Sequence, residues 1–253
     1  MGNVLSQAEI DALLNSLNTG EEQESEPELR GEDKKARIYD FRTANKFPKE
    51  QIRTLNMVFE TFTQLFSNQL TGILRTSCEC EMFSIEEITF NEYNNSLPVP
   101  VILALLKVPP MGGTHILQIS PEAAYMIINK LLGGGMSGGE SMAKQFTEIE
   151  LVLLERVLRQ TMRVFNESWD KVFKVDTQIE RIETSSQFTQ VVALNDPVAL
   201  VTMNLSIGAE SGLFSVCIPH MSIEPVAKQL NSRLLYTGSQ EVKQSKEIGR
   251  AHV

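Results

Sequence analysis

Two segments of the chain repeat the same order of features, and this repeat constrains the fold more than any other part of the sequence. ILQISPEAAYMIINKLL (residues 116–132) and FSVCIPHMSIEPVAKQL (residues 214–230) align without gaps. Three aligned pairs are identical: Pro121 with Pro219, Lys130 with Lys228, and Leu132 with Leu230. Each segment is typical of a strand, a proline and a helix, and each follows a long amphipathic helix and several strands. We therefore predict a duplicated α-β unit whose copies share one sheet layer covered by helices.

Apolar residues three and four positions apart predict two long amphipathic helices. The second begins at Thr147, where Thr147 and Glu150 match a capping box and Phe146 and Leu151 match a hydrophobic staple. The first helix has a core stripe of Ile52, Leu55, Val58, Phe59, Phe62, Leu65, Phe66 and Leu70. The second has a core stripe of Leu154, Val157, Leu158, Met162 and Phe165.

The remaining patterned segments predict strands and two shorter helices, which makes the fold class α+β. TSCECEMFSIEEI, PVPVILALLKV and THILQIS are predicted strands of the first half, and PEAAYMIINKLL is a predicted helix with Pro121 near its first turn. In the second half, KVDTQIERI, QFTQVVAL, ALVTMNLSI and GLFSVCIP predict three or four strands, and MSIEPVAKQL predicts a last helix.

The acidic composition restricts the classes of partner. The chain has 253 residues and a formal net charge of -9. A surface of this charge repels phosphate backbones and anionic lipids, so we expect no nucleic-acid partner. No apolar run approaches about 20 residues, so no direct membrane insertion is expected. The odd, sparse set of three cysteines is typical of reduced thiols in a cytosolic protein.

The opening segment, LSQAEIDALLNSL, predicts a short, well-specified helix. Ser6 and Glu9 match a capping box, and Leu5 and Ile10 match a hydrophobic staple. One apolar stripe follows helical spacing, at Ile10, Leu13, Leu14 and Leu17. A helix of this length is marginal alone in water, below or near about 12–15 residues.

A charged segment of linker composition, EEQESEPELRGEDKKAR, follows this helix. Such a linker reaches roughly 25 Å on a flexible-chain estimate. Two interpretations remain for the helix. It docks on its own domain, or it is a short linear motif that folds into the groove of another protein.

The glycine run LLGGGMSGG (residues 131–139) has two interpretations as well. It lacks the Lys-Ser/Thr of a P-loop and follows a helix rather than a strand, so it matches no nucleotide-binding fingerprint. It is either a helix C-cap at Gly133 with a following loop, or a recognition loop whose bare backbone lets a partner approach closely.

Nothing in the pattern predicts catalysis, a cofactor or a metal site. Cys78 and Cys80 would share a strand face, but His115, His220 and His252 have no ligand spacing with one another. No serine lies in a nucleophile elbow and no acidic pair stands out. The second long helix carries a basic stripe, which is either a solvated face or a contact for an acidic partner: Arg156, Arg159 and Arg163.

LSQAEIDALL strongly resembles the N-terminal motif of the FliM family of bacterial flagellar motor switch proteins. The resemblance continues from Val4 to about Leu235, through YDFR (Tyr39–Arg42), the glycine run, FTEIE (Phe146–Glu150) and CIPH (Cys217–His220). It implies a response-regulator-binding helix at 1–19, a flexible acidic linker at 20–38, a middle domain at 39–235 and a disordered tail at 236–253.

In that family the N-terminal helix captures phosphorylated CheY. The resemblance implies that the regulator binds at Leu5, Ser6, Gln7, Glu9, Ile10, Asp11, Leu13 and Leu14. The glycine loop contacts FliG, the torque-bearing rotor protein, which would involve Gly133, Gly134, Gly135, Met136 and Gly138. Met136 departs from the Gly-Gly-x-Gly pattern of the family. Neighbouring FliM copies pack side by side in the ring on the cytoplasmic face of the membrane.

The resemblance also implies a CheC-like, pseudo-twofold α/β/α fold for the middle domain, in agreement with the repeat. CheC-type phosphatases of this fold carry Glu and Asn three residues apart on a helix. Here Glu155 is followed by Leu158. We therefore expect no enzyme, and a response-regulator phosphatase is the alternative function.

FliM proteins continue into a C-terminal domain that joins FliN. The last residues here, EIGRAHV (Glu247–Val253), resemble the translation of a sequencing-library adapter. We expect these residues to be non-native and the gene to be cut short, so that FliN binding is expected only of a full-length chain.

Overall fold

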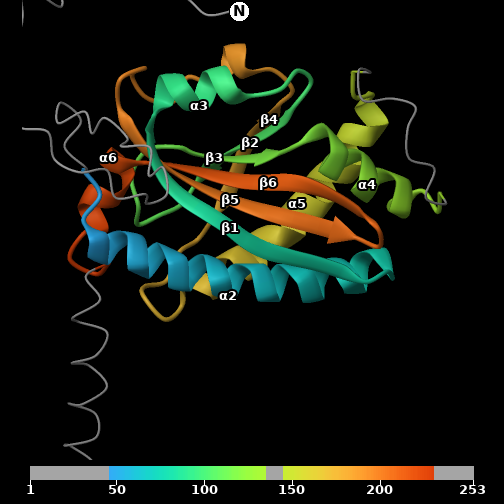
Figure 1. Cartoon of the computed structure of the whole chain (residues 1–253), viewed down its shortest axis with the longest axis horizontal. Helices are drawn as coiled ribbons and strands as arrows, with labels where there is room; N and C mark the ends of the chain where they lie inside the picture. Colours follow the sequence, from blue (N-terminus) through green and yellow to red (C-terminus); the bar gives the residue numbers. More distant parts are fainter. Residues whose placement is uncertain (1–45, 135–144, 231–253) are drawn as a thin grey trace, which may run out of the picture. The chain divides into compact units, whose positions relative to one another are not determined.

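The computed structural model describes residues 46–134 and 145–230, which form one antiparallel sheet with helices packed against it (Figure 1). The helices of the first half are α2 (Lys49–Leu74), α3 (Phe90–Ser96) and α4 (Pro121–Leu131). Those of the second half are α5 (Glu148–Trp169) and α6 (His220–Ile223), with 3-10 turns η1 (Ser186–Phe188) and η2 (Glu224–Val226). The strands are β1 (Cys78–Thr89), β2 (Ile102–Lys107), β3 (His115–Ile119), β4 (Gln178–Glu183), β5 (Pro197–Ile207) and β6 (Glu210–Pro219).

The order of the strands confirms the predicted duplication. The sheet runs β1-β5-β6-β3-β2-β4. Exchanging each strand with its counterpart in the other half (β1 with β4, β2 with β5, β3 with β6) turns this order into its reverse. A pseudo-twofold axis therefore passes between β3 and β6, where Leu117 is the antiparallel partner of Val216. Each repeated proline lies at the change from strand to helix, since Pro121 begins α4 and Pro219 ends β6.

Aromatic side chains from α2, α5 and β6 form the centre of the main core. The rings of Phe62 and Phe165 lie 5.6 Å apart, edge to face, and those of Phe66 and Phe214 lie 5.0 Å apart. Phe62, Phe66 and Phe165 are buried, as the helical stripes predict, and Phe214 of β6 is buried with them. Burying one such side chain stabilises the fold by roughly 1.5–3 kcal/mol, so this cluster anchors both long helices to the sheet.

The opposite face of the sheet is covered near α3 by a smaller core. Thr89 and Glu92 form a capping box that begins α3, and this short helix buries Phe90 and Tyr93. Its other buried members are Val101, Leu103, Ile116, Val192, Val198 and Cys217.

Hydroxyl groups of α2 occupy backbone donors on the edge strand β1. The Cys80 amide donates to Ser67 Oγ at 2.8 Å, and the Cys78 amide donates to Thr71 Oγ1 at 3.1 Å. Figure 1 shows α2 running alongside β1. An edge strand with open donors is a template for unwanted pairing. The packing of α2 therefore closes the first part of this edge.

Two predicted elements are wrong. QFTQVVAL is not a strand: η1 begins this segment, and both the amide and the hydroxyl of Thr189 donate to the Ser186 carbonyl. The predicted last helix is the four-residue α6 followed by η2, because Pro225 has no amide hydrogen to continue α-helical bonding. Within the two described ranges, none of the helices is long and apolar enough to cross a membrane.

Candidate functional site

The end of α4 shows how the glycine run begins. Gly133 has φ +75°, a left-handed conformation that favours glycine. Its amide donates to the Lys130 carbonyl at 3.2 Å, and the Gly134 amide donates to the Asn129 carbonyl at 2.8 Å. This pair of bonds defines a Schellman motif. The predicted C-cap at Gly133 is therefore confirmed, and it leaves Leu132 exposed at the tip of the helix.

The described residues resume at residue 145, just before α5. Thr147 and Glu150 form the predicted capping box, with the Thr147 amide donating to Glu150 Oε2 at 2.7 Å. One residue earlier, the Phe146 ring stacks on Tyr125 of α4 at 4.8 Å between centroids. Burial, together with the Glu150 carboxylate, raises the pKa of Tyr125. Both stems of the glycine loop are thus fixed to α4 and α5.

Most of the predicted contact residues lie outside the described part of the chain. Gly133 and Gly134 are described, whereas Gly135, Met136 and Gly138 are not. The eight predicted regulator-binding residues, from Leu5 to Leu14, and the linker also lie outside it. The same holds for the tail beyond residue 230.

The outer face of α5 carries an apolar pair followed by the predicted arginines. Ile149 is 73% exposed and Val152 is 65% exposed. Arg159 pairs with Glu155 one turn away, at 2.9 Å from Nε to Oε1. Arg156 and Arg163 are exposed and have no acidic partner among the described residues. We name these five residues the α5 stripe: Ile149, Val152, Arg156, Arg159 and Arg163.

The structure offers no arrangement for phosphatase chemistry on α5. Leu158, at the position where the phosphatase pattern has asparagine, is buried in the core. The Glu155 carboxylate forms an ion pair with Arg159.

The three cysteines are buried. Burial raises the pKa of Cys80 to about 12, which keeps it a neutral thiol. Across residues 46–134 and 145–230, no group of three His, Cys, Asp or Glu side chains could hold a metal ion.

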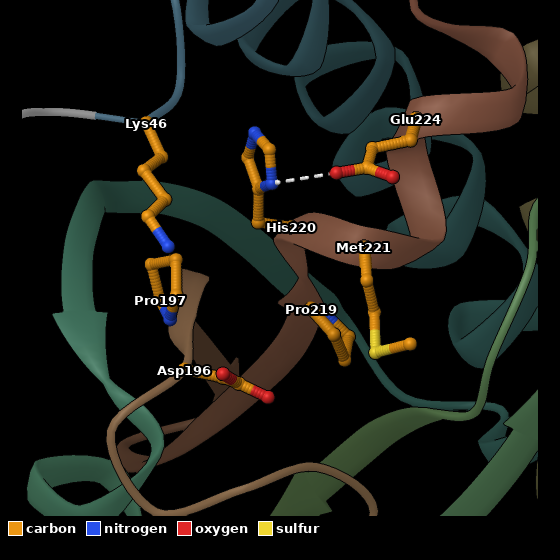
Figure 2. Close-up of a pocket in the computed structure, with 7 residues that line it drawn as sticks. All are labelled: Lys46, Asp196, Pro197, Pro219, His220, Met221 and Glu224. Carbon is orange, nitrogen blue, oxygen red and sulfur yellow. Dashed lines mark ion pairs between the residues drawn. The ribbon is translucent and has the colours of Figure 1, made fainter.

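A cavity of about 290 Å³ lies beside His220, the last residue of CIPH (Figure 2). His220 Nδ1 is 3.7 Å from Glu224 Oε1, and the Phe47 ring meets the imidazole edge to face at 5.0 Å. The lining is completed by Lys46, Asp196, Pro197, Pro219 and Met221. The charged groups of the lining have both signs, with Lys46 and His220 opposite in type to Asp196 and Glu224.

A buried histidine, His115, joins the start of β3 to α6. Ser222 Oγ donates to the Pro219 carbonyl at 2.6 Å, so His115 Nε2 is the donor in its 2.9 Å bond to Ser222 Oγ. Burial lowers the pKa of His115 to about 4, so this imidazole is neutral at neutral pH.

An acidic surface on the sheet is the feature that sequence reasoning missed. Phe83 is 76% exposed on the same face of β1 as Glu79 and Glu81, and it lies at a β-bulge between Met82 and Ser84 in the pairing with β5. Leu213 of β6 is 50% exposed. We name the following residues the acidic sheet surface: Glu79, Glu81, Phe83, Asn204, Ser206 and Leu213. The alternation CECEMF contained the signal, because the strand places both glutamates on the face away from the buried cysteines.

Comparisons with known proteins agree with this architecture. The family model "Flagellar motor switch protein FliM" matches residues 48–235. The flagellar motor switch protein FliM of Treponema pallidum is 33% identical over 237 residues, which cover 94% of this chain and 69% of that protein. A crystal structure of the FliM middle domain from H. pylori matches with a TM-score of 0.66 and 32% identity, over 72% of this chain and 99% of that one. A FliG–FliM complex from H. pylori matches with a TM-score of 0.68 and 33% identity, over 74% of this chain and 100% of that one.

The duplicated α-β unit, the single six-stranded sheet and the capped glycine-loop stems define the middle domain of a flagellar motor switch protein. The chain belongs to the FliM family. The fold class predicted from the sequence, α+β with a pseudo-twofold middle domain, is confirmed.

Proposed function

We propose that this chain is a component of the cytoplasmic rotor ring, where it couples capture of phosphorylated CheY to the rotor protein FliG. It acts by binding and without catalysis. Capture can bias the ring between two rotation states because a ligand shifts an equilibrium by its difference in affinity for the two states.

The geometry of the glycine-loop stems carries the FliG part of the proposal. The Schellman motif at Gly133 fixes one end of a glycine-rich segment at the C-terminus of α4, and the ring stack of Phe146 on Tyr125 fixes the other end against the same helix. A related chain from H. pylori was crystallised with FliG. We propose that FliG binds at Gly133, Gly134, Gly135, Met136 and Gly138, with Gly138 compensating for Met136.

The sequence pattern of the opening segment supports the CheY part. Phosphorylated CheY presents a groove in which the helix folds, and buried apolar area at Ile10, Leu13 and Leu14 offsets the cost of ordering. Ser6, Gln7, Glu9 and Asp11 set the polar register. The linker raises the local concentration of captured regulator near the middle domain.

The experiment is a titration of the chain with CheY, with and without beryllofluoride as the phosphoryl mimic. We expect tighter binding of the activated form and loss of that binding when residues 1–20 are deleted. Ile10→Asp is the matched point variant, and it should abolish capture while the domain stays folded by circular dichroism. Equal affinity for both forms of CheY, or normal binding by the deletion, would overturn the capture proposal.

A second assay tests FliG binding and the absence of catalysis. Gly133→Val places a branched side chain at a positive φ and should weaken FliG binding, whereas Gly72→Ala should not, since a Cβ at Gly72 has no neighbour within 4 Å. Added chain should not accelerate loss of phosphate from CheY. Acceleration would favour the phosphatase alternative.

A further inference from the structure

The acidic sheet surface combines exposed apolar groups with uncompensated negative charge. Phe83 and Leu213 are its exposed apolar members. Glu79 and Glu81 form no ion pair with any residue in the described part of the chain. Asn204 lies between the two sides, as the cross-strand partner of both Glu81 and Leu213. From Leu213 to Glu81 this row spans about 10 Å, which is the width of a helix.

The α5 stripe has the complementary chemistry. Ile149 and Val152 are exposed apolar residues in its first turns, and Arg156 and Arg163 are unpaired cations two turns apart. The five residues of the α5 stripe follow one another at intervals of three, four, three and four residues, so they lie on one face of the helix. The opposite face of α5 is occupied, because Leu154, Leu158 and Phe165 pack in the main core.

We infer that the α5 stripe of one copy docks on the acidic sheet surface of the next copy. Within one copy the two surfaces cannot meet, since α5 packs on one face of the sheet and its stripe points away from that face. A partly uncovered sheet face is a surface on which a helix packs well. Ile149 and Val152 would cover Phe83 and Leu213, and the unpaired arginines would reach the two unpaired glutamates.

This inference deepens the proposed function, on which it rests, because side-by-side copies belong to a rotor ring. The contact joins two different surfaces and is therefore heterologous. A heterologous contact leaves one free surface at each end, so copies add head to tail. Such a series closes into a ring when the rotation between copies divides the circle.

The test is site-specific cross-linking of the full chain with a short bis-maleimide. Val152→Cys and Leu213→Cys replace exposed side chains, and the native cysteines are buried. A chain with both substitutions should give a ladder of dimers, trimers and larger species. A mixture of the two single variants should stop at a dimer that contains one of each, identified by different tags. Either single variant alone should give no cross-linked species.

The control replaces Val152→Cys with Met57→Cys, an exposed position on α2. It should not cross-link to Leu213→Cys. Dimers of a single variant alone would show a symmetric contact, and equal cross-linking by the control would show random collision. Either result, or no cross-link with the designed pair, would overturn the inference.

Charge exchange gives an independent readout. Arg156→Glu with Arg163→Glu should lower the cross-linking yield by about five-fold or more, through loss of two ion pairs. Glu79→Arg with Glu81→Arg in the partner copy should restore it. A FliG pull-down of the same variants separates the two proposals. Retained FliG binding without cross-linking overturns only the copy-to-copy contact, whereas loss of FliG binding by the unaltered chain overturns the proposed function.

Discussion

Gly212 of β6 lies close against the backbone of the first turn of α4. A Cβ added there would lie 2.6 Å from the Ala123 nitrogen and 2.9 Å from the Ala123 Cα. Neither backbone atom can give way without moving the first turn of α4. The start of that helix is also tied to β6 by hydrogen bonds, since the Leu213 amide donates to Ser120 Oγ at 3.1 Å.

We predict that Gly212→Ala lowers the free energy of unfolding by about 1–3 kcal/mol, the usual effect of overpacking a core. Urea unfolding followed by circular dichroism measures this change. Gly72→Ala is the matched control. Gly72 lies within α2 and a Cβ there has no neighbour within 4 Å, so alanine should raise the free energy of unfolding by about 0.5–1 kcal/mol. Similar effects of the two substitutions would contradict the close approach at Ala123.

At the scale of elements, the pairing of α2 with β1 depends on side-chain hydroxyls. Ser67 Oγ accepts from the Cys80 amide at 2.8 Å, and its own hydroxyl donates to the Thr63 carbonyl at 2.7 Å. We predict that Ser67→Ala lowers the free energy of unfolding by about 1–3 kcal/mol, because a partly buried amide loses its acceptor. Hydrogen exchange at the Cys80 amide should accelerate, which mass spectrometry or NMR can measure.

Thr61→Ala is the control for this helix. The Thr61 hydroxyl donates only to the Met57 carbonyl of its own helix at 2.9 Å. Its removal should change the free energy of unfolding by less than about 0.5 kcal/mol, as for other surface positions. Unchanged exchange at Cys80 in Ser67→Ala would contradict the role of Ser67 in closing the edge.

Elements set by local chemistry were predictable from the sequence. The capping box at Thr147 and the glycine C-cap at Gly133 each depend on a few neighbouring residues, and the structure has both. Segment 187–194 was predicted wrongly as a strand, because its Thr189 bonds locally to Ser186 rather than to another strand. The bulge at Phe83 depends on the register against β5, more than a hundred residues later, and no local pattern specifies it.

The candidate site likewise has a part that could be predicted from local sequence and a part that could not. The stem residues Gly133, Gly134 and Thr147 could be placed from their sequence, since caps are local. The acidic sheet surface could be placed only in part: the alternation of CECEMF puts Glu79 and Glu81 on one face of β1, but the members from β5 and β6 join them only through long-range pairing.

At the scale of the whole molecule, the two halves of the repeat are interleaved rather than side by side. β1 of the first half is separated from β2 and β3 by β5 and β6 of the second. Neither half contains a complete sheet. We predict that fragments 1–139 and 140–253 do not fold when each is expressed alone, and that they form a folded complex when co-expressed.

Size-exclusion chromatography and circular dichroism of the co-expressed pair, with a tag on one fragment, test this prediction. We expect a one-to-one complex with a single cooperative unfolding transition. A cooperative transition in either fragment alone would show that its half is an independent domain, in conflict with the strand order.

Interleaving also delays the pairing of β1 during protein synthesis. β1 has one strand neighbour in the described sheet, β5, and that strand ends only at Ile207. At about 5–20 residues per second, a ribosome needs roughly 6–24 s to make the chain from Thr89 to Ile207. During this interval the chain contains α2 and β1 but not β5, so β1 lacks its partner in the sheet. The pairing of β1 with its neighbour in the sheet therefore waits until most of the domain has been synthesised.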